Sequence, residues 1–202
     1  MVYPITKRIL WPIFALFVKR IDGFENIPNE QCIFVANHES YIDGPLILLM
    51  LAWHKNIKVY TFATNVKFTG AIWDFLFEHF GAIRIGGSME KAFKKLDQGY
   101  SLSLWPEGAR SESEKLLPTK HTGLGVIALK RKIPVVPIGL DTFHFWPRGQ
   151  KLWNWKRCMV ITIGKPMRFS GRFSKPAALK VVHTSMKEVS KLARISHAKA
   201  AA

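Results

Sequence analysis

Short apolar segments typical of buried strands alternate with helix-like segments along most of this 202-residue chain. The strand-like segments are rich in β-branched and aromatic residues, and glycines or prolines separate them from the helix-like ones. We expect strands at 32–36, 57–63, 82–85, 100–106, 133–140 and 158–164, and helices at 44–53, 67–80, 88–99, 120–132 and 175–195. This alternation predicts an α/β fold, with a mixed, largely parallel sheet covered by helices.

Proline interrupts one of these strands, because Pro134 and Pro137 lie within the segment 133–140. A proline has no backbone N–H to donate to a neighbouring strand. We therefore expect this strand at an edge of the sheet, or its prolines near a strand end.

Near its start the chain has an apolar segment, Ile9–Val18, whose ten residues are about half of what a membrane-spanning helix requires. Basic residues flank it at 7–8 and 19–20, and no small-residue cleavage site of the secretory type follows. Its aromatic residues leave no polar face, so we expect a helix that lies in a bilayer interface. A helix of the protein core is the alternative. We therefore divide the chain into a membrane-associating helix, 1–22, and one α/β domain, 23–202.

The chain carries a large positive charge, with 30 Lys and Arg against 14 Asp and Glu and a formal net charge of +16. From Arg148 onward there are thirteen basic residues and one acidic residue, Glu188. Such a surface attracts polyanions, either nucleic acid or an anionic membrane. Between Phe143 and Arg157 basic residues alternate with tryptophans, a pattern typical of the membrane headgroup region, although a loop packed on the core would share it.

The two cysteines, Cys32 and Cys158, fit no metal-ligand spacing. Cys32 opens a predicted strand, so we expect a buried reduced thiol there and a reducing compartment for the chain. The sequence predicts no metal site.

Polar residues follow two of the predicted strands at the point where each strand ends. His38 and Asp43 come after the strand 32–36, and the stretch Pro106–Ser111 comes after the strand 100–106. If these strands are parallel neighbours, both groups lie at the same edge of the sheet, where functional groups of α/β proteins gather.

His38 and Asp43 can form a hydrogen-bonded pair only if no continuous helix joins them. Residues five apart on a helix point about 140° away from one another, so His38 must stay in a loop while Asp43 begins the next helix. The carboxylate would then accept the Nδ1–H of the imidazole and leave Nε2 free to take a proton from a substrate hydroxyl. A helix-capping aspartate beside an unrelated loop histidine is the alternative.

Two arginines are candidates for binding an anionic group. Arg110 follows a tight turn, and its planar guanidinium suits a phosphate, with Glu107 to steady the turn or orient the arginine. Arg84 lies in a short apolar strand, where a buried guanidinium requires an anionic partner. The alternatives are a surface turn with an ordinary Glu–Arg pair and an edge-strand arginine that reaches solvent.

Taken in order, these motifs resemble those of the glycerolipid acyltransferase family, the 1-acylglycerol-3-phosphate acyltransferases and related lysophospholipid acyltransferases. The first family motif, N-H-x-S-x-x-D, is matched by Asn37, His38, Ser40 and Asp43. The third, F-P-E-G-T-R-S, is matched by Pro106, Glu107, Gly108, Arg110 and Ser111, with Trp105 in place of Phe and Ala109 in place of Thr. The fourth, V-P-x-x-P-V, is matched loosely by 133–138, and the second is shortened to Gly81–Arg84.

The resemblance implies an enzyme in which His38 is the general base and Asp43 orients it. The hydroxyl of a lysophospholipid, in the first place 1-acylglycerol 3-phosphate, attacks the thioester of acyl-CoA or acyl-carrier protein, a co-substrate, and no other cofactor or metal is implied. The residues that would bind the acceptor are Glu107, Gly108, Arg110, Ser111, Asn37 and Arg84. Because Ala109 lacks the threonine hydroxyl, the identity of the acceptor stays open. Glycerol 3-phosphate, another lysophospholipid or a lyso-aminolipid are the alternatives.

An enzyme with a lipid acceptor is expected to work on an anionic membrane surface, and we place it peripherally or monotopically on the cytoplasmic face. A nucleic-acid-binding module would also explain the charge, but not the pairing of His38 with Asp43, so we expect no specific nucleic acid partner. A lipid-binding protein with an inactive site is a third alternative.

Overall fold

The structure, a computed structural model, describes residues 3–63, 70–84, 88–113, 115–119 and 121–201. In this part of the chain the strands are β1 (Val18–Asp22), β2 (Ile33–Ala36), β3 (Val59–Ala63), β4 (Ala82–Arg84), β5 (Ser101–Leu104), β6 (Val135–Asp141) and β7 (Met159–Ile163). The helices are α1 (Tyr3–Ala15), α2 (Asp43–Lys55), α3 (Ala71–His79), α4 (Ser88–Asp97), α5 (Gly123–Arg131) and α6 (Lys175–Ala201), with a 3-10 turn at Phe24–Asn26. From β2 to β6 strands and helices alternate, as the sequence predicts.

The described strands form one sheet in the order β1-β7-β6-β2-β5-β3-β4. Strands β6 and β7 are antiparallel, whereas the other neighbouring strands are parallel. The prediction of a mixed, largely parallel α/β sheet is therefore confirmed. Strands β2 and β5 are parallel neighbours, with Val35 opposite Leu104, so the polar residues that follow them reach the same edge of the sheet.

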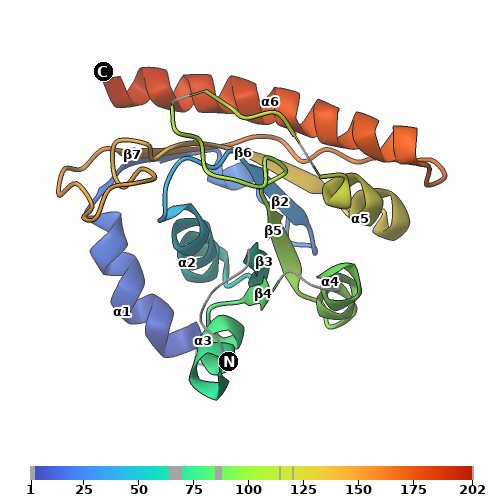
Figure 1. Cartoon of the computed structure of the whole chain (residues 1–202), viewed down its shortest axis with the longest axis horizontal. Helices are drawn as coiled ribbons and strands as arrows, with labels where there is room; N and C mark the ends of the chain where they lie inside the picture. The colour runs from blue at the N-terminus through green and yellow to red at the C-terminus, as the bar shows by residue number, and fades with distance from the viewer. Residues whose placement is uncertain (1–2, 64–69, 85–87, 114, 120, 202) are drawn as a thin grey trace.

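Helices cover both faces of this sheet (Figure 1). Successive side chains of a strand point to opposite faces. Phe34 of β2 therefore joins a buried cluster with Trp11 of α1 and Leu46 of α2, whereas its neighbour Ile33 joins a second cluster with Val182 of α6. Burial of apolar side chains on both faces holds the three layers together.

Helix α6 lies directly on its neighbours because glycines remove the side chains between them. A Cβ added at Gly139 in β6 would lie 2.2 Å from the backbone nitrogen of Ala193 in α6. A Cβ added at Gly125 in α5 would lie 2.1 Å from the carbonyl oxygen of Ala178. Gly125 lowers the helix propensity of α5, but its missing side chain allows the backbones of α5 and α6 to come close together.

Two strand positions differ from the sequence expectation. Residues 18–22, assigned above to the N-terminal segment, form β1, an edge strand parallel to β7. Strand β6 lies inside the sheet, between β7 and β2, so the edge position, one of the two alternatives expected, is wrong. The other alternative holds for Pro134, which directly precedes β6, whereas Pro137 lies within the strand, opposite Val35 of β2 and just before Ile138, the first residue that pairs with β7.

Helix α1 has one side in the core and one side exposed. The ring of Trp11 is buried against His54 of α2. The side chains of Ile9, Ile13 and, just after the helix, Leu16 are 58, 49 and 68% exposed. Among the described residues, no helix combines the length and the apolar run that crossing a bilayer requires. The contact of the exposed side with a membrane stays a prediction.

Candidate active site

The polar residues after β2 and β5 meet at one edge of the sheet. The N–H of Ser111 donates to the carbonyl oxygen of His38 (2.7 Å), and the N–H of His38 donates to Oε1 of Glu107 (3.0 Å). The two segments are therefore joined directly, as the parallel pairing of β2 with β5 leads one to expect.

His38 and Asp43 form the hydrogen-bonded pair that the sequence predicted. Nδ1 of His38 lies 2.7 Å from Oδ2 of Asp43. The geometry is possible because His38 stays in the loop after β2, while Asp43 is the first residue of α2. The carboxylate is fully buried, whereas 19% of the His38 side chain is exposed. A buried acid that orients a partly exposed imidazole is the arrangement of a catalytic base and its support.

Further donors converge on Asp43 and fix the tautomer of its partner. Oδ2 also accepts the N–H groups of Glu39 (2.7 Å) and Ser40 (2.8 Å), and Oδ1 accepts the hydroxyl of Thr142 (2.5 Å). Because these partners all donate, the ionised carboxylate can satisfy them as an acceptor alone. We therefore assign the proton of a neutral His38 to Nδ1, which leaves the lone pair of Nε2 for a substrate.

Thr142 is a site residue that the sequence analysis missed. It directly follows β6, and its N–H donates to Oε2 of the buried Glu39 (3.2 Å). A signal was available, because this polar residue lies just after a third predicted strand. Asp43 and Thr142 are 99 positions apart, so their contact cannot be seen in the sequence.

Asn37 and Ser111, both expected to bind the acceptor, are buried and bond to the protein backbone. The side-chain amide of Asn37 donates to the carbonyl oxygen of Leu140 (2.9 Å) and accepts its N–H (2.8 Å). The hydroxyl of Ser111 donates to the carbonyl oxygen of Lys115 (2.7 Å). These contacts position the loops beside His38.

Glu107, also expected at the acceptor, is buried and braces the same loops. Its Oε1 accepts the N–H of His38, and its Oε2 accepts the N–H of Leu117 (2.7 Å). The pKa of this carboxyl is raised to about 7, mainly by burial and in smaller part by the nearby carboxylates Glu39 and Asp43, while the two N–H groups lower it. Glu107 thus holds the backbone of His38 in place.

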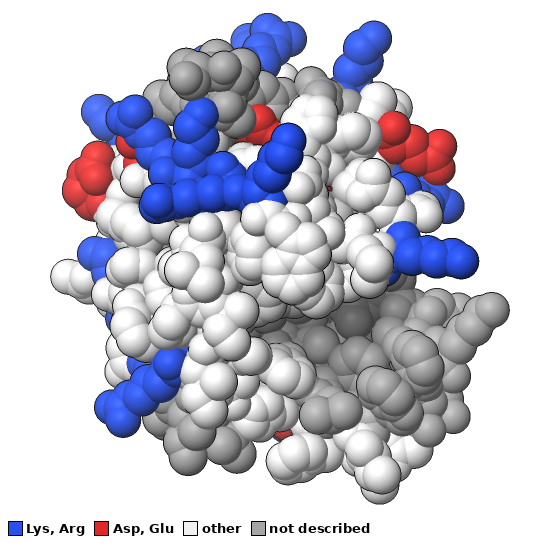
Figure 2. Space-filling view, turned by 90° about the vertical axis from the view of Figure 1, so that its left-hand side faces the viewer, with Lys and Arg blue, Asp and Glu red and all other residues white. Residues whose placement is uncertain are grey.

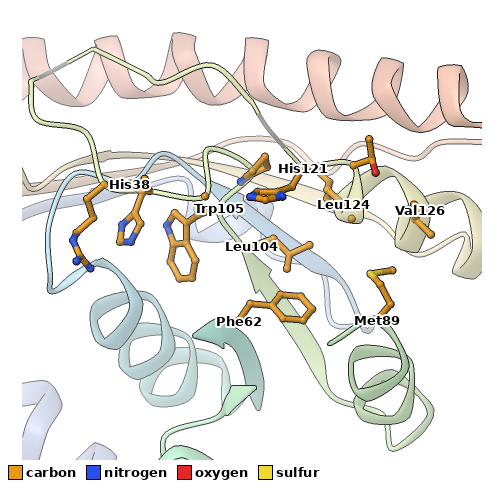
Figure 3. A pocket seen from close by; sticks show the side chains of 14 residues that line it. His38, Phe62, Met89, Leu104, Trp105, His121, Leu124 and Val126 are labelled. Atoms are coloured by element: carbon orange, nitrogen blue, oxygen red, sulfur yellow. The ribbon is translucent and has the colours of Figure 1, made fainter. Parts of the chain in front are cut away.

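A cavity of about 440 Å³ opens beside His38, a size within the usual range of small-molecule sites (Figure 3). Arg110 lines it, with its guanidinium carbon 4.0 Å from the ring centre of Tyr41. The Nε of Arg110 is buried and has no hydrogen-bond partner among the described residues. The described lining includes no acidic side chain. An anionic group would therefore meet Arg110 in this cavity without a competing carboxylate.

Gly108 lines the cavity at the turn after β5. Its φ of +70° lies in the left-handed region, and its N–H donates to the carbonyl oxygen of Trp105 (3.0 Å). A Cβ at this position would lie 2.5 Å from Nε2 of His121, a second imidazole of the cavity that the sequence analysis did not single out. The backbone conformation therefore favours glycine, and any larger residue would also displace the ring of His121.

Residues 19–141 match the family model described as Acyltransferase, which covers more than half of the chain. The chain belongs to this acyltransferase family.

Curated members of the family with similar sequences come from plants. The chain is 28% identical over 150 residues to the 1-acyl-sn-glycerol-3-phosphate acyltransferase BAT2, chloroplastic, of Brassica napus, covering 69% of this chain and 42% of that protein. It is 28% identical over 170 residues to LPAT1, chloroplastic, of Arabidopsis thaliana, covering 78% of this chain and 46% of that one. The chain spans about half the length of these relatives.

The fold also matches a solved member of the family, the 1-acyl-sn-glycerophosphate (LPA) acyltransferase PlsC of Thermotoga maritima. The TM-score is 0.72 at 26% identity, over 95% of this chain and 79% of that chain. The similarity in fold thus extends over nearly the whole of this chain.

Arg84 is the last residue of β4, and β4, β3, β5 and β2 are parallel, so its backbone lies at the same edge of the sheet as His38. Its side chain lies outside the part that the structure describes, and its proposed phosphate contact stays a prediction. Among the described residues no group of three or more His, Cys, Asp or Glu is placed to hold a metal ion.

Proposed function

We propose that this chain transfers a fatty acyl group from a thioester, acyl-CoA or acyl-carrier protein, to the free hydroxyl of a lysophospholipid. The observation that carries the proposal is the 2.7 Å contact between Nδ1 of His38 and the buried Asp43, at the wall of a cavity. The family membership and the names of the relatives support 1-acylglycerol 3-phosphate as the acceptor, which gives phosphatidic acid as product.

The chemistry follows from the two roles of His38. Its Nε2 takes the proton of the acceptor hydroxyl as the oxygen attacks the thioester carbonyl carbon. The tetrahedral intermediate then collapses, the carbon–sulfur bond breaks, and the imidazolium returns its proton to the leaving thiolate. Asp43 stabilises the imidazolium and keeps the ring aimed throughout. Arg110 holds the acceptor phosphate, because a guanidinium binds phosphate oxygens through paired N–H donors.

The partner surface that we propose is the cytoplasmic face of an anionic membrane. Figure 2 shows Lys and Arg gathered in a band on the side of the molecule where β1 forms the sheet edge, next to a wide uncharged surface. Exposed apolar side chains occur in the same region, with Leu16 after α1 and Leu152 and Trp155 in the loop before β7 exposed by 68, 75 and 72%. Arg157 of that loop bonds through Nε to the carbonyl oxygen of Val18 (2.7 Å), which joins the loop to β1.

An aromatic row connects this surface with the cavity. Tyr41, on which Arg110 stacks, contacts Trp146 at 5.3 Å between ring centres. Trp146 contacts Trp153 at 5.4 Å, and Trp153 contacts Trp155 at 5.3 Å. Indole rings prefer the membrane interface, so the row supports entry of a lipid acceptor toward Arg110 from the bilayer side.

The decisive experiment measures release of free thiol from acyl-CoA with a panel of acceptors: 1-acylglycerol 3-phosphate, glycerol 3-phosphate, other lysophospholipids and a lyso-aminolipid. We expect the highest rate with 1-acylglycerol 3-phosphate, and loss of turnover in His38→Ala with unchanged circular dichroism and vesicle binding. Turnover at the wild-type rate in His38→Ala would remove this residue as the base. Binding to duplex DNA without acyl transfer by the wild type would favour a nucleic-acid-binding module.

A further inference from the structure

Trp105 stands directly beside His38, at the position where the acyltransferase motif of the sequence analysis has phenylalanine. The two rings are 5.2 Å apart at their centres and inclined by 34°. Figure 3 shows the indole between His38 on one side and Leu104 and Phe62 on the other. A Cβ added at Gly44, in the first turn of α2, would lie 3.8 Å from Cη2 of the indole. The ring therefore reaches from the end of β5 to the start of α2.

The two ends of the cavity differ in chemistry on either side of this ring. His38 and Arg110 supply polar groups at one end. The rest of the lining adds the polar side chains of His121 and Thr122 and five apolar side chains from different elements: Phe62, Met89, Leu104, Leu124 and Val126. Figure 3 places the five apolar side chains together on the side of Trp105 away from His38, with His121 at the edge of that group. An apolar ligand chain gains most by lying at that end.

The indole N–H adds a second observation. Nε1 of Trp105 is buried and finds no hydrogen-bond partner among the described residues. Buried tryptophan N–H groups usually do have a partner. Phenylalanine in its place would therefore lose no hydrogen bond in this arrangement, so the size and shape of the ring are what tryptophan contributes here.

We propose that Trp105 determines the acyl-chain specificity of the proposed transfer reaction. Its indole is the partition between the acceptor end of the cavity, at His38 and Arg110, and the apolar end that takes the acyl chain. The ring thereby sets how much of the chain is buried when the thioester carbon lies beside His38. This inference rests on the proposed function.

The test compares Trp105→Phe and Trp105→Ala with the wild type on acyl-CoA donors from octanoyl to octadecanoyl, with 1-acylglycerol 3-phosphate as acceptor. Circular dichroism and thermal melting check the fold, and Trp105→Phe keeps an aromatic ring if the alanine variant does not fold. We expect the ratio of kcat/KM between long and short donors to change by about tenfold, the effect of one or two methylene groups gaining or losing burial. The KM of the acceptor should stay within about twofold.

Trp53→Phe is the control. Trp53 lies on α2, is 41% exposed, and neither lines the cavity nor belongs to the aromatic row. The donor ratio of this variant should equal that of the wild type. Equal loss of rate with all donors in the Trp105 variants, or a change confined to the acceptor KM, would overturn the proposal.

A second readout separates this inference from the proposed function. Fatty acids of the same lengths compete with a fluorescent fatty-acid analogue for binding to the wild type and the variants. If the wild type shows no acyl transfer, the proposed function fails, yet a changed order of competition in Trp105→Phe would still support the acyl-chain partition. An unchanged order would reject the partition, and so would an unchanged donor ratio in an active enzyme.

Discussion

Nδ1 of His38 lies 2.7 Å from Oδ2 of Asp43 because the chain bends from strand to helix between them. Glu107 fixes this loop through the N–H of His38, while Thr142 and two loop N–H groups fix the carboxylate. The imidazole is thus supported on its backbone and on its ring, which leaves Nε2 as the part available to a substrate. Such preorganisation is what a general base requires.

Asp43→Asn should lower kcat strongly and change the acceptor KM little. An asparagine cannot accept from all four donors that meet the carboxylate, so the His38 ring loses its fixed tautomer and aim. Steady-state kinetics with 1-acylglycerol 3-phosphate measure the change, and an unchanged kcat would rule out the orienting role of Asp43.

Thr142→Val removes a single donor to the same carboxylate and keeps the carboxylate itself. It removes one hydrogen bond to a charged group and should lower the free energy of unfolding by roughly 1.5–3 kcal/mol.

Arg110→Ala should mainly raise the acceptor KM, because the cavity loses the guanidinium that we assign to the phosphate. Initial rates with acceptor and donor varied separately distinguish the two constants. Arg131→Ala serves as the control, since Arg131 pairs with Asp97 on the surface and does not line the cavity. An increase in the donor KM alone would show that Arg110 does not bind the acceptor.

Glu107→Gln should make the stability difference from the wild type depend on pH. Burial is the main reason why the pKa of Glu107 is raised to about 7 in the folded chain from its ordinary value of 4.5. The folded state therefore binds this proton more tightly, so the contribution of Glu107 to stability is greatest below about pH 4.5 and is lost as the pH rises through 7. Urea unfolding from pH 5 to 8 should show the wild type losing stability relative to Glu107→Gln as the pH rises. A constant difference would mean that the pKa of Glu107 is not raised.

Lys156→Ala should weaken binding to anionic vesicles about fivefold, because a basic residue near such a surface contributes about 1 kcal/mol. Lys156 is exposed in the loop that carries Trp155. Vesicle sedimentation at several salt concentrations measures the effect. Lys180→Ala removes an exposed lysine from α6, on the opposite face of the sheet from α1, and should bind as the wild type does. Equal losses in both variants would point to net charge rather than to a docking surface.

The sequence by itself determined the α/β alternation and the residues His38 and Asp43. Both depend on neighbours along the chain: apolar periodicity selects strand or helix, and a bend between two elements brings residues five apart together. The sequence also made Arg110 a candidate for binding an anion, and the structure places Arg110 in the cavity. The resemblance to the acyltransferase motifs added Asn37, whose contacts to Leu140 the motif alone does not reveal.

Only the tertiary structure decided what each polar residue touches. The order of the strands places β6 beside β2, and this brings Thr142 to Asp43 across 99 residues. The tertiary structure also decides that the carboxylate of Glu107 accepts two backbone N–H groups, and that Trp105 lies between His38 and the apolar end of the cavity. These contacts join distant segments, and they form because folding must bury apolar faces and at the same time pair most of the polar groups that become buried. Contacts of this kind cannot be predicted from local sequence patterns, because each depends on several distant segments packing together.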